Sequence, residues 1–141
     1  MFQNKKVVVV MPAYNAARTL EQTHAEILEQ GMVDQIILVD DASHDNTVEI
    51  ASNLALVKIA VHPTNRGYGG NQKTCYRLAL EEGADIVIMI HPDYQYTPKL
   101  IYPMAYVIAS DLYHVVLGSR ILGLGALKVE CPIINMYSIG C

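Results

Sequence analysis

Side chains that could bind an anion or a metal ion occur in five short clusters, each placed where a buried strand is expected to end. The clusters are residues 12–15 (PAYN), 40–43 (DDAS), 65–70 (NRGYGG), 91–95 (HPDYQ) and 118–120 (GSR). Short apolar runs are typical of parallel strands that are buried on both faces. The carboxyl ends of such strands meet at one edge of a sheet, where ligands bind. We therefore expect one pocket with carboxylates, amides and an arginine, which suits an anionic substrate bridged by a metal ion.

Two adjacent acids, Asp40 and Asp41, follow the apolar residues 36–39. A carboxylate at this place can accept hydrogen bonds from a nucleobase N–H or a ribose hydroxyl. Alternatively, one of the two caps the next helix, a role for which Asp and Ser are well suited. Because two carboxylates are adjacent and Ser43 follows them, we expect at least one to be available to a ligand.

Three possible metal ligands follow the apolar residues 86–90 at every second position. They are His91, Asp93 and Gln95. They offer an imidazole nitrogen, a carboxylate oxygen and an amide oxygen. Such a set suits Mg²⁺ or Mn²⁺ that holds a diphosphate, because these ions keep open positions for phosphate oxygens. An ordinary turn aspartate before a helix would give the same pattern.

The remaining two clusters are weaker signals. Residues 65–71 are rich in glycine and precede a predicted helix. Glycine allows a ligand to approach the backbone closely, and a helix N-terminus favours anions, although a flexible connection would have the same composition. Arg120 ends the last predicted strand with a guanidinium, the preferred partner of phosphate, yet a lone arginine at such a place is more often a surface charge.

The elements that would position these clusters alternate between strands and helices. The predicted strands are residues 6–11, 35–39, 57–61, 85–90 and 113–117, and the predicted helices are residues 16–30, 47–56, 72–82 and one that opens at Thr97 and Pro98. Asn46 and Glu49 are spaced like a capping box, and Pro103 should bend the last helix or delay its start. Right-handed crossovers then give an α/β protein with a three-layer, doubly wound, mainly parallel sheet.

The bulk composition limits the possible functions. The 141 residues suffice for one domain with a sizeable core, and they are 52% hydrophobic with a net charge of −4, which argues against a nucleic-acid partner. No apolar run approaches the roughly 20 residues of a membrane span. Pro12 and Asn15 interrupt the first apolar run too early for a secretion signal, so we expect a cytoplasmic location. The three cysteines form no CxxC pair, which disfavours a zinc site or a disulfide framework.

Taken together, the ordered clusters resemble the family 2 glycosyltransferases, which have a GT-A nucleotide-sugar fold. The resemblance is closest to the branch of dolichyl-phosphate mannose synthase and bacterial polyprenyl-phosphate glycosyltransferases, and it runs from about Lys6 to Gly123. Residues 7–15 look like the first strand of that family and its P-x-Y-N turn. Residues 36–47 look like its V-D-D-x-S-x-D-x-T segment, and residues 65–70 look like its N-x-G loop.

The resemblance implies a role for each cluster. The nucleotide-binding residues would be Pro12, Ala13, Tyr14, Asn15, Asp40, Asp41, Arg66 and Gly67, with Asp41 the better candidate for the base. Asp93 would be the remaining carboxylate of a D-x-D metal motif, with His91 and Gln95 as further ligands, and Arg120 would contact the phosphates. Asp93 and Arg120 are thus the catalytic candidates.

Two departures from the family pattern affect this assignment. His91 takes the place of the first aspartate of the motif, which should lower the affinity for Mg²⁺ while still allowing Mn²⁺. Alternatively, His91 hydrogen-bonds a phosphate. Ala16 stands where close relatives often carry a glutamate, so one polar contact to the nucleotide is absent.

The implied reaction is the transfer of a sugar, with inversion, from a UDP- or GDP-sugar to an acceptor, assisted by a divalent metal (Mn or Mg). A polyprenyl phosphate acceptor would need no general base, and it would bring the protein to the inner face of the membrane. Family members usually continue further, so we expect residues 1–141 to be a single nucleotide-sugar-binding GT-A domain, truncated and incomplete after about residue 123.

Other classes of protein fit the sequence less well. The alternative is a non-catalytic nucleotide-sugar-binding or assembly domain, and Tyr102, Tyr106 and Tyr113 could contribute to a homo-oligomer interface. A phosphoacceptor signalling domain would need its paired acids after the first strand. A nicotinamide-dependent oxidoreductase would need a glycine fingerprint that this strand lacks.

Overall fold

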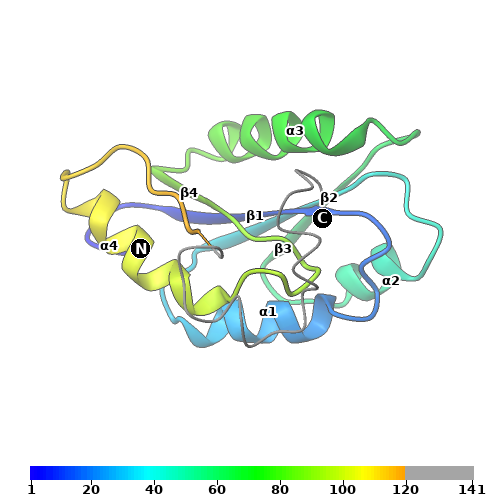
Figure 1. Ribbon diagram of the computed structural model, residues 1–141, viewed down its shortest axis with the longest axis horizontal. Coiled ribbons are helices and arrows are strands. Elements are labelled where there is room, and N and C mark those ends of the chain that lie inside the picture. Colours follow the sequence, from blue (N-terminus) through cyan, green and yellow to red (C-terminus); the bar gives the residue numbers. More distant parts are fainter. Residues whose placement is uncertain (120–141) are drawn as a thin grey trace.

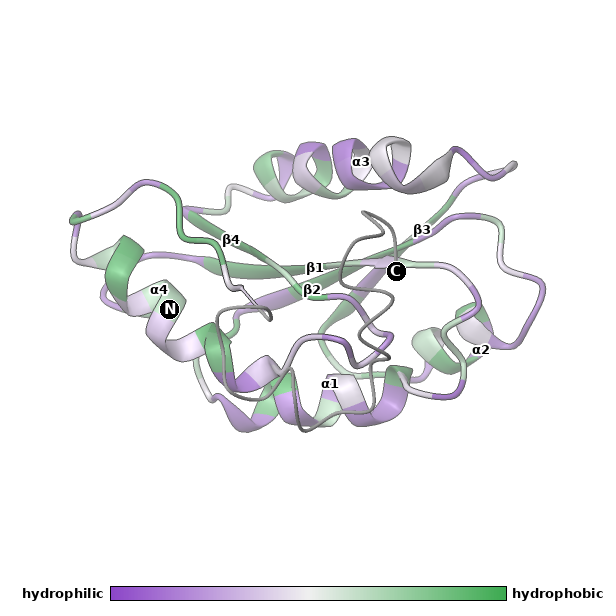
Figure 2. Ribbon diagram, in the orientation of Figure 1, coloured by the Kyte–Doolittle hydropathy of each residue, from purple (hydrophilic) through white to green (hydrophobic). Residues whose placement is uncertain are grey.

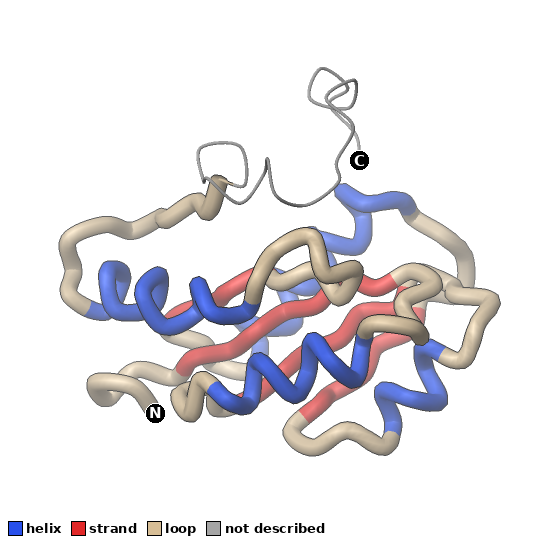
Figure 3. The backbone as a smooth tube through the Cα atoms, turned by 60° about the horizontal axis from the view of Figure 1, so that its bottom comes forward, coloured by secondary structure: helices blue, strands red, loops and turns tan. Residues whose placement is uncertain are grey.

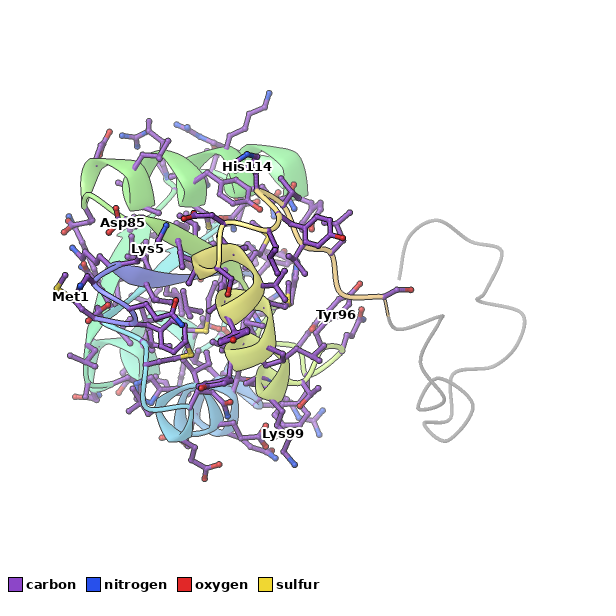
Figure 4. The ribbon with its side chains drawn as sticks, turned by 90° about the vertical axis from the view of Figure 1, so that its left-hand side faces the viewer. Met1, Lys5, Asp85, Tyr96, Lys99 and His114 are labelled. Carbon is purple, nitrogen blue, oxygen red and sulfur yellow. The ribbon has the colours of Figure 1, made fainter. Side chains whose placement is uncertain are left out.

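The protein is built around a four-stranded parallel sheet, seen in a computed structural model that describes residues 1–119. The strands are β1 (Val7–Ala13), β2 (Gln35–Asp40), β3 (Val57–Val61) and β4 (Ile86–Met89), in the order β3-β2-β1-β4. All three pairs of neighbouring strands run parallel. Lys5 and Asp85, which precede neighbouring strands, lie together beside Met1 (Figure 4), so the carboxyl ends of the strands share the opposite edge.

Helices cover both faces of the sheet. They are α1 (Leu20–Glu29), α2 (Thr47–Ser52), α3 (Gly67–Glu81) and α4 (Ile101–Ala109), the last preceded by the 3-10 turn η1 (Pro98–Leu100). Helix α3 lies on one face, whereas α1, α2 and α4 lie on the other (Figure 1). Figure 3 looks onto the face that carries these three helices. The predicted three-layer, doubly wound α/β architecture is therefore confirmed.

The central strand β1 is buried along its whole length, and its side chains supply both halves of the core. Val7, Val9 and Met11 point to the face of α1, α2 and α4, whereas Val8 and Val10 pack with buried residues of α3. Because successive side chains of a strand alternate between faces, a strand covered on both sides must be apolar at every position. Figure 2 shows this apolar centre between helices whose outer faces are more hydrophilic.

Several predicted helix boundaries move in the structure. Helix α1 begins at Leu20 instead of residue 16, and α3 begins at Gly67 instead of residue 72, so most of the glycine-rich segment is helical. The predicted capping box at Asn46 is wrong, because the Asn46 side chain makes no capping hydrogen bond. Pro103 lies within α4, which begins at Ile101. Of the two effects predicted for Pro103, a bend or a delayed start, the structure shows the delayed start. Within residues 1–119, no helix is long and apolar enough to cross a membrane.

The predicted fifth strand, residues 113–117, is wrong. These residues have no regular secondary structure, and the side chains of Val115 and Leu117 are 71% and 88% exposed. Their β-branched composition favours a strand, but a strand forms only when a neighbour supplies the hydrogen-bond partners. In the part of the chain that the structure describes, β4 pairs with β1 alone.

Candidate functional site

A pocket of about 630 Å³ opens at the edge where the parallel strands end. Its walls come from four segments that are remote in sequence. The contributing residues are 12–16, 18 and 19 at and after the end of β1, Asp41 after β2, Asn65, Gly67, Tyr68 and Asn71 around the start of α3, and 91–93 after β4. The expectation of one pocket at this edge is met.

Most of the residues that the sequence assigned to the site line this pocket. They are Pro12, Ala13, Tyr14, Asn15, Asp41, Gly67, His91 and Asp93. Three others, Asp40, Arg66 and Gln95, are not among the lining residues. Arg120 lies outside the described residues.

The turn after β1 is held in place by the segment that follows β2. The backbone N–H of Asn15 donates to Ser43 Oγ at 2.8 Å, and that of Ala16 donates to Thr47 Oγ1 at 2.8 Å. In return, the amide oxygen of Asn15 accepts from the backbone N–H of His44 at 2.9 Å. The Asn15 side chain thus has a structural partner, and the turn forms one rigid wall of the pocket.

The two adjacent acids have different environments. Asp40 is 1% exposed, and its carboxylate accepts hydrogen bonds from the backbone N–H and the hydroxyl of Ser43. Its oxygens therefore shape the turn after β2. The alternative that one of the two acids caps the next helix is wrong, because α2 begins at Thr47, whose backbone N–H donates to Asp45. Asp41 is also buried, at 3% exposed, but it lies on the pocket wall.

Asp41 is held by the start of α3 and by a histidine at the end of β3. Its Oδ1 atom accepts from the backbone N–H of Arg66 at 2.8 Å and lies 2.7 Å from Nδ1 of His62. Burial by itself would raise the pKa of Asp41, but the hydrogen bonds from Arg66 and His62 outweigh it and hold the pKa below its usual value. Asp41 is therefore a carboxylate at neutral pH.

The start of α3 explains two of the glycines. Gly67 has a φ of +73°, a conformation that side chains with a Cβ rarely adopt, and its N–H donates to Asn65 Oδ1 at 2.9 Å. A Cβ on Gly70 would lie 2.8 Å from the Cβ of Arg66, so no side chain fits there. Buried Asn71 then donates to the carbonyl oxygen of Val39 at 2.9 Å, which fixes α3 to the end of β2.

The loop after β4 forms a further wall of the pocket. Thr19 at the start of α1 donates its hydroxyl to the carbonyl oxygen of Pro92, and Tyr94 bonds to Glu26 and Gln22 of α1. Asp93 is exposed, and its Oδ1 accepts from the backbone N–H of Gln95 at 3.0 Å. An exposed carboxylate on a loop anchored at two points is available to a ligand in the pocket.

His91 lies beside two tyrosine rings. Its Nε2 is 3.2 Å from the hydroxyl of Tyr68, and the His91 ring centroid is 5.3 Å from that of Tyr68 and 6.3 Å from that of Tyr96. Burial lowers the pKa of His91, with Asp93 opposing the shift. A neutral imidazole is the form that binds metals.

The fit of a divalent cation to this wall can be judged from the donor set. Residues 1–119 contain no group of three or more His, Cys, Asp or Glu side chains close enough to hold a metal ion. His91 and Asp93 would supply two ligands and leave the other positions open. This fits Mg²⁺ or Mn²⁺ that is bound mainly through the phosphates of a substrate.

The sequence assigns no individual role to three residues of the site. His62 follows β3 and could have been noticed by the same strand-end rule that found the other clusters. Asn71 belongs to the glycine-rich segment 65–71, but its bond to Val39 depends on how α3 packs on the sheet. Arg18 is the one Lys or Arg among the described residues that line the pocket, and it belongs to no recognisable sequence motif.

The fold defines an α/β protein of the GT-A type, with a pocket where the parallel strands end. Residues 8–128 match the family model described as glycosyl transferase family 2. The chain therefore belongs to glycosyl transferase family 2.

Similar proteins agree with this assignment. The UDP-N-acetylglucosamine–dolichyl-phosphate N-acetylglucosaminyltransferase of Methanococcus voltae is 32% identical over 134 residues, which cover 84% of this chain and 53% of that protein. The chain spans about half the length of the first curated relatives it matches, 50% and 53%.

Solved structures show the same architecture. A mannosyltransferase from Pyrobaculum calidifontis in complex with GDP-Man and Mn²⁺ has a TM-score of 0.52 at 27% identity, over 63% of this chain and 28% of that chain. Glucosyl-3-phosphoglycerate synthase from Mycobacterium tuberculosis, in complex with Mn²⁺ and UDP, has a TM-score of 0.60 at 24% identity, over 76% and 40% of the two chains. The second likeness concerns the fold alone.

Proposed function

We propose that this chain binds a UDP- or GDP-sugar in the pocket at the sheet edge and transfers the sugar, with inversion, to a polyprenyl phosphate. The observation that carries the proposal is the convergence of the turn after β1, Asp41, the start of α3 and residues 91–93 on one pocket of about 630 Å³. This volume falls within the range of small-molecule sites. The relative from Methanococcus voltae supports the choice of acceptor, since its name describes transfer to dolichyl phosphate.

The proposal divides the pocket between base and diphosphate. Pro12, Ala13 and Tyr14 would line the nucleoside, and Asp41 would accept a hydrogen bond from the base. At the other wall, Asp93 and His91 would hold a divalent cation, with Gln95 beside them. Such a cation stabilises the negative charge that develops on a departing diphosphate. Arg120 stays a predicted phosphate contact.

A polyprenyl phosphate acceptor removes the need for a general base in the pocket. A hydroxyl acceptor would require a general base to remove its proton. The oxygen of a lipid phosphate is already ionised near neutral pH, so positioning and charge stabilisation suffice. With this acceptor the reaction would take place at the inner, cytoplasmic face of a membrane, with the protein peripheral to it. A homo-oligomer is a further expectation from the exposed tyrosines.

The proposal is tested by thermal unfolding with nucleotides and metal. UDP or GDP should raise the melting temperature by roughly 5–10 °C at a hundredfold excess over its Kd, and more with Mn²⁺ than without. Asp93→Asn should remove the metal-dependent part, because it deletes the charge while keeping an acceptor for the Gln95 N–H. Asp111→Asn is the matched control, since Asp111 is exposed and lies at the end of α4.

Two results would contradict the proposal. If neither nucleotide changes the melting temperature, the pocket is not a nucleotide site. If the Asp93→Asn and wild-type proteins respond equally to Mn²⁺, the cation binds elsewhere. Sugar transfer to a short polyprenyl phosphate, measured with the same protein, tests the acceptor.

The second candidate is a domain that binds a nucleotide sugar without transferring it. The observation that favours it is the pocket lining within residues 1–119, whose two carboxylates, Asp41 and Asp93, are both assigned to binding, to the base and to the cation. Metal-dependent stabilisation by a nucleotide, combined with no transfer to any polyprenyl phosphate, is the result expected for this candidate.

A further inference from the structure

His62 is a buried residue beside the pocket to which the proposed function assigns no role. It is 6% exposed, with Nδ1 at 2.7 Å from Asp41 Oδ1 and Nε2 at 3.0 Å from Thr74 Oγ1 of α3. An ionised carboxylate can only accept hydrogen bonds, so Nδ1 carries the proton that His62 donates to Asp41. The ring is thus held at both nitrogens, between the end of β2 and helix α3.

This contact decides which oxygen of Asp41 is available. Oδ1 accepts from His62 Nδ1 and from the backbone N–H of Arg66, which lies at 2.8 Å. Two donors fill the two lone-pair positions of a carboxylate oxygen. Asp41 can therefore offer a ligand in the pocket no more than one oxygen, Oδ2.

Uracil and guanine, the two bases that the proposed function allows, differ in how many oxygens of this carboxylate they need as hydrogen-bond acceptors. Uracil presents a single imino N–H between two carbonyl oxygens, so one carboxylate oxygen satisfies it. Guanine presents a ring N–H and an amino N–H side by side, and both oxygens of a carboxylate are needed to pair them. With Oδ1 filled, one guanine donor would be left without a partner, which weakens binding.

Resting on the proposed function, we propose that His62 is a positioning residue that makes this pocket select uridine diphosphates over guanosine diphosphates. His62 does not touch the nucleotide. It acts through Asp41, by occupying Oδ1 and by holding the carboxylate in one orientation. The donor sugar is then a UDP-sugar.

The test is calorimetric titration of UDP and GDP, in the presence of Mn²⁺, into the wild-type chain and three variants. The wild-type protein should bind UDP at least about tenfold more tightly than GDP. In His62→Ala, Oδ1 gains a free lone pair, and the UDP-to-GDP preference should fall by about threefold or more. His62→Asn should restore it, because the asparagine amide N–H can replace Nδ1–H. Thr74→Val should leave it unchanged, because it removes only the contact to Nε2.

The possible outcomes test the selectivity, the positioning role of His62 and the nucleotide site separately. If wild-type protein binds GDP as tightly as UDP, the selectivity is overturned although the proposed nucleotide site stands. An unchanged preference in a folded His62→Ala variant, checked by circular dichroism, would exclude the positioning role. If His62→Ala does not fold, the wild-type preference and the His62→Asn variant decide the question. Absence of binding by either nucleotide would overturn the proposed function, and this inference with it.

Discussion

At the scale of single residues, the turn after β2 contains a backbone conformation that its residue does not favour. Ala42 lies between Asp41 and Ser43 with a φ of +60°. The left-handed conformation costs an L-residue about 1–2 kcal/mol, which glycine avoids. Glycine in turn loses about 0.5–1 kcal/mol more chain entropy on folding than alanine. The difference predicts a small net strain at residue 42.

We predict that Ala42→Gly raises the free energy of unfolding by about 0.5–1 kcal/mol, measured by urea denaturation. The matched control is Ala25→Gly, an exposed position inside α1. There the same change should lower stability by about 1 kcal/mol, because glycine is a poor helix former. Equal losses in both variants would show that Ala42 is not strained.

The burial of Cys75 predicts how its thiol reacts. Its side chain is fully buried against the sheet, and burial raises the pKa of the Cys75 thiol to about 12. At pH 8, about one thiol in ten thousand is then ionised, and only the thiolate is nucleophilic. We expect iodoacetamide to leave Cys75 unmodified in the native protein and to modify it in denaturant, as measured by peptide mass mapping. Rapid labelling of native Cys75 would contradict its burial.

At the scale of the elements, one carboxylate ties the start of α2 to the turn after β1. Asp45 accepts hydrogen bonds from the backbone N–H of Thr47 at 3.0 Å, from the Thr47 hydroxyl at 2.5 Å and from the backbone N–H of Ala17 at 3.1 Å. It takes the capping function that the sequence assigned to Asn46. The reason is geometric, because the turn presents Asp45 to both segments.

Asp45→Ala should therefore lower the free energy of unfolding by about 1–2 kcal/mol, the usual effect of removing a helix cap. Asn46→Ala is the control and should change it by less than about 0.5 kcal/mol, because the Asn46 side chain makes no capping bond. Chemical denaturation of both variants measures the difference. If Asn46→Ala lowered the free energy of unfolding more than Asp45→Ala does, the result would support the capping box predicted from the sequence.

At the scale of the whole molecule, three aspartates that join remote segments set the response to acid. Burial alone would raise the pKa values of Asp34, Asp41 and Asp45, but their hydrogen bonds outweigh it, and each pKa lies below the ordinary 3.8. The folded state thus binds protons less readily than the unfolded state. Their stabilisation is fully present above the unfolded-state pKa and is lost as the pH falls through the lowered folded-state values.

We predict a urea midpoint that is nearly constant around pH 6 and declines steadily below about pH 4. The decline should be shallower in Asp45→Asn, which cannot take up a proton at this position. Urea titrations at several pH values between about 6 and 2.5 provide the measurement. A midpoint that rises on acidification would require these pKa values to lie above 3.8.

Much of this protein was determined by local sequence. The apolar runs fixed the four strands, and the rule that parallel strands end at one edge brought Tyr14, Asp41 and Asp93 to one pocket. These features follow from periodicity and burial, which a segment carries by itself. Tertiary structure alone decided that Asp40 bonds to Ser43 whereas Asp41 lines the pocket, that His62 holds Asp41, and that residues 113–117 form no strand. Each of these depends on a hydrogen-bond partner supplied by the way the chain packs, and the residue type alone does not specify that partner.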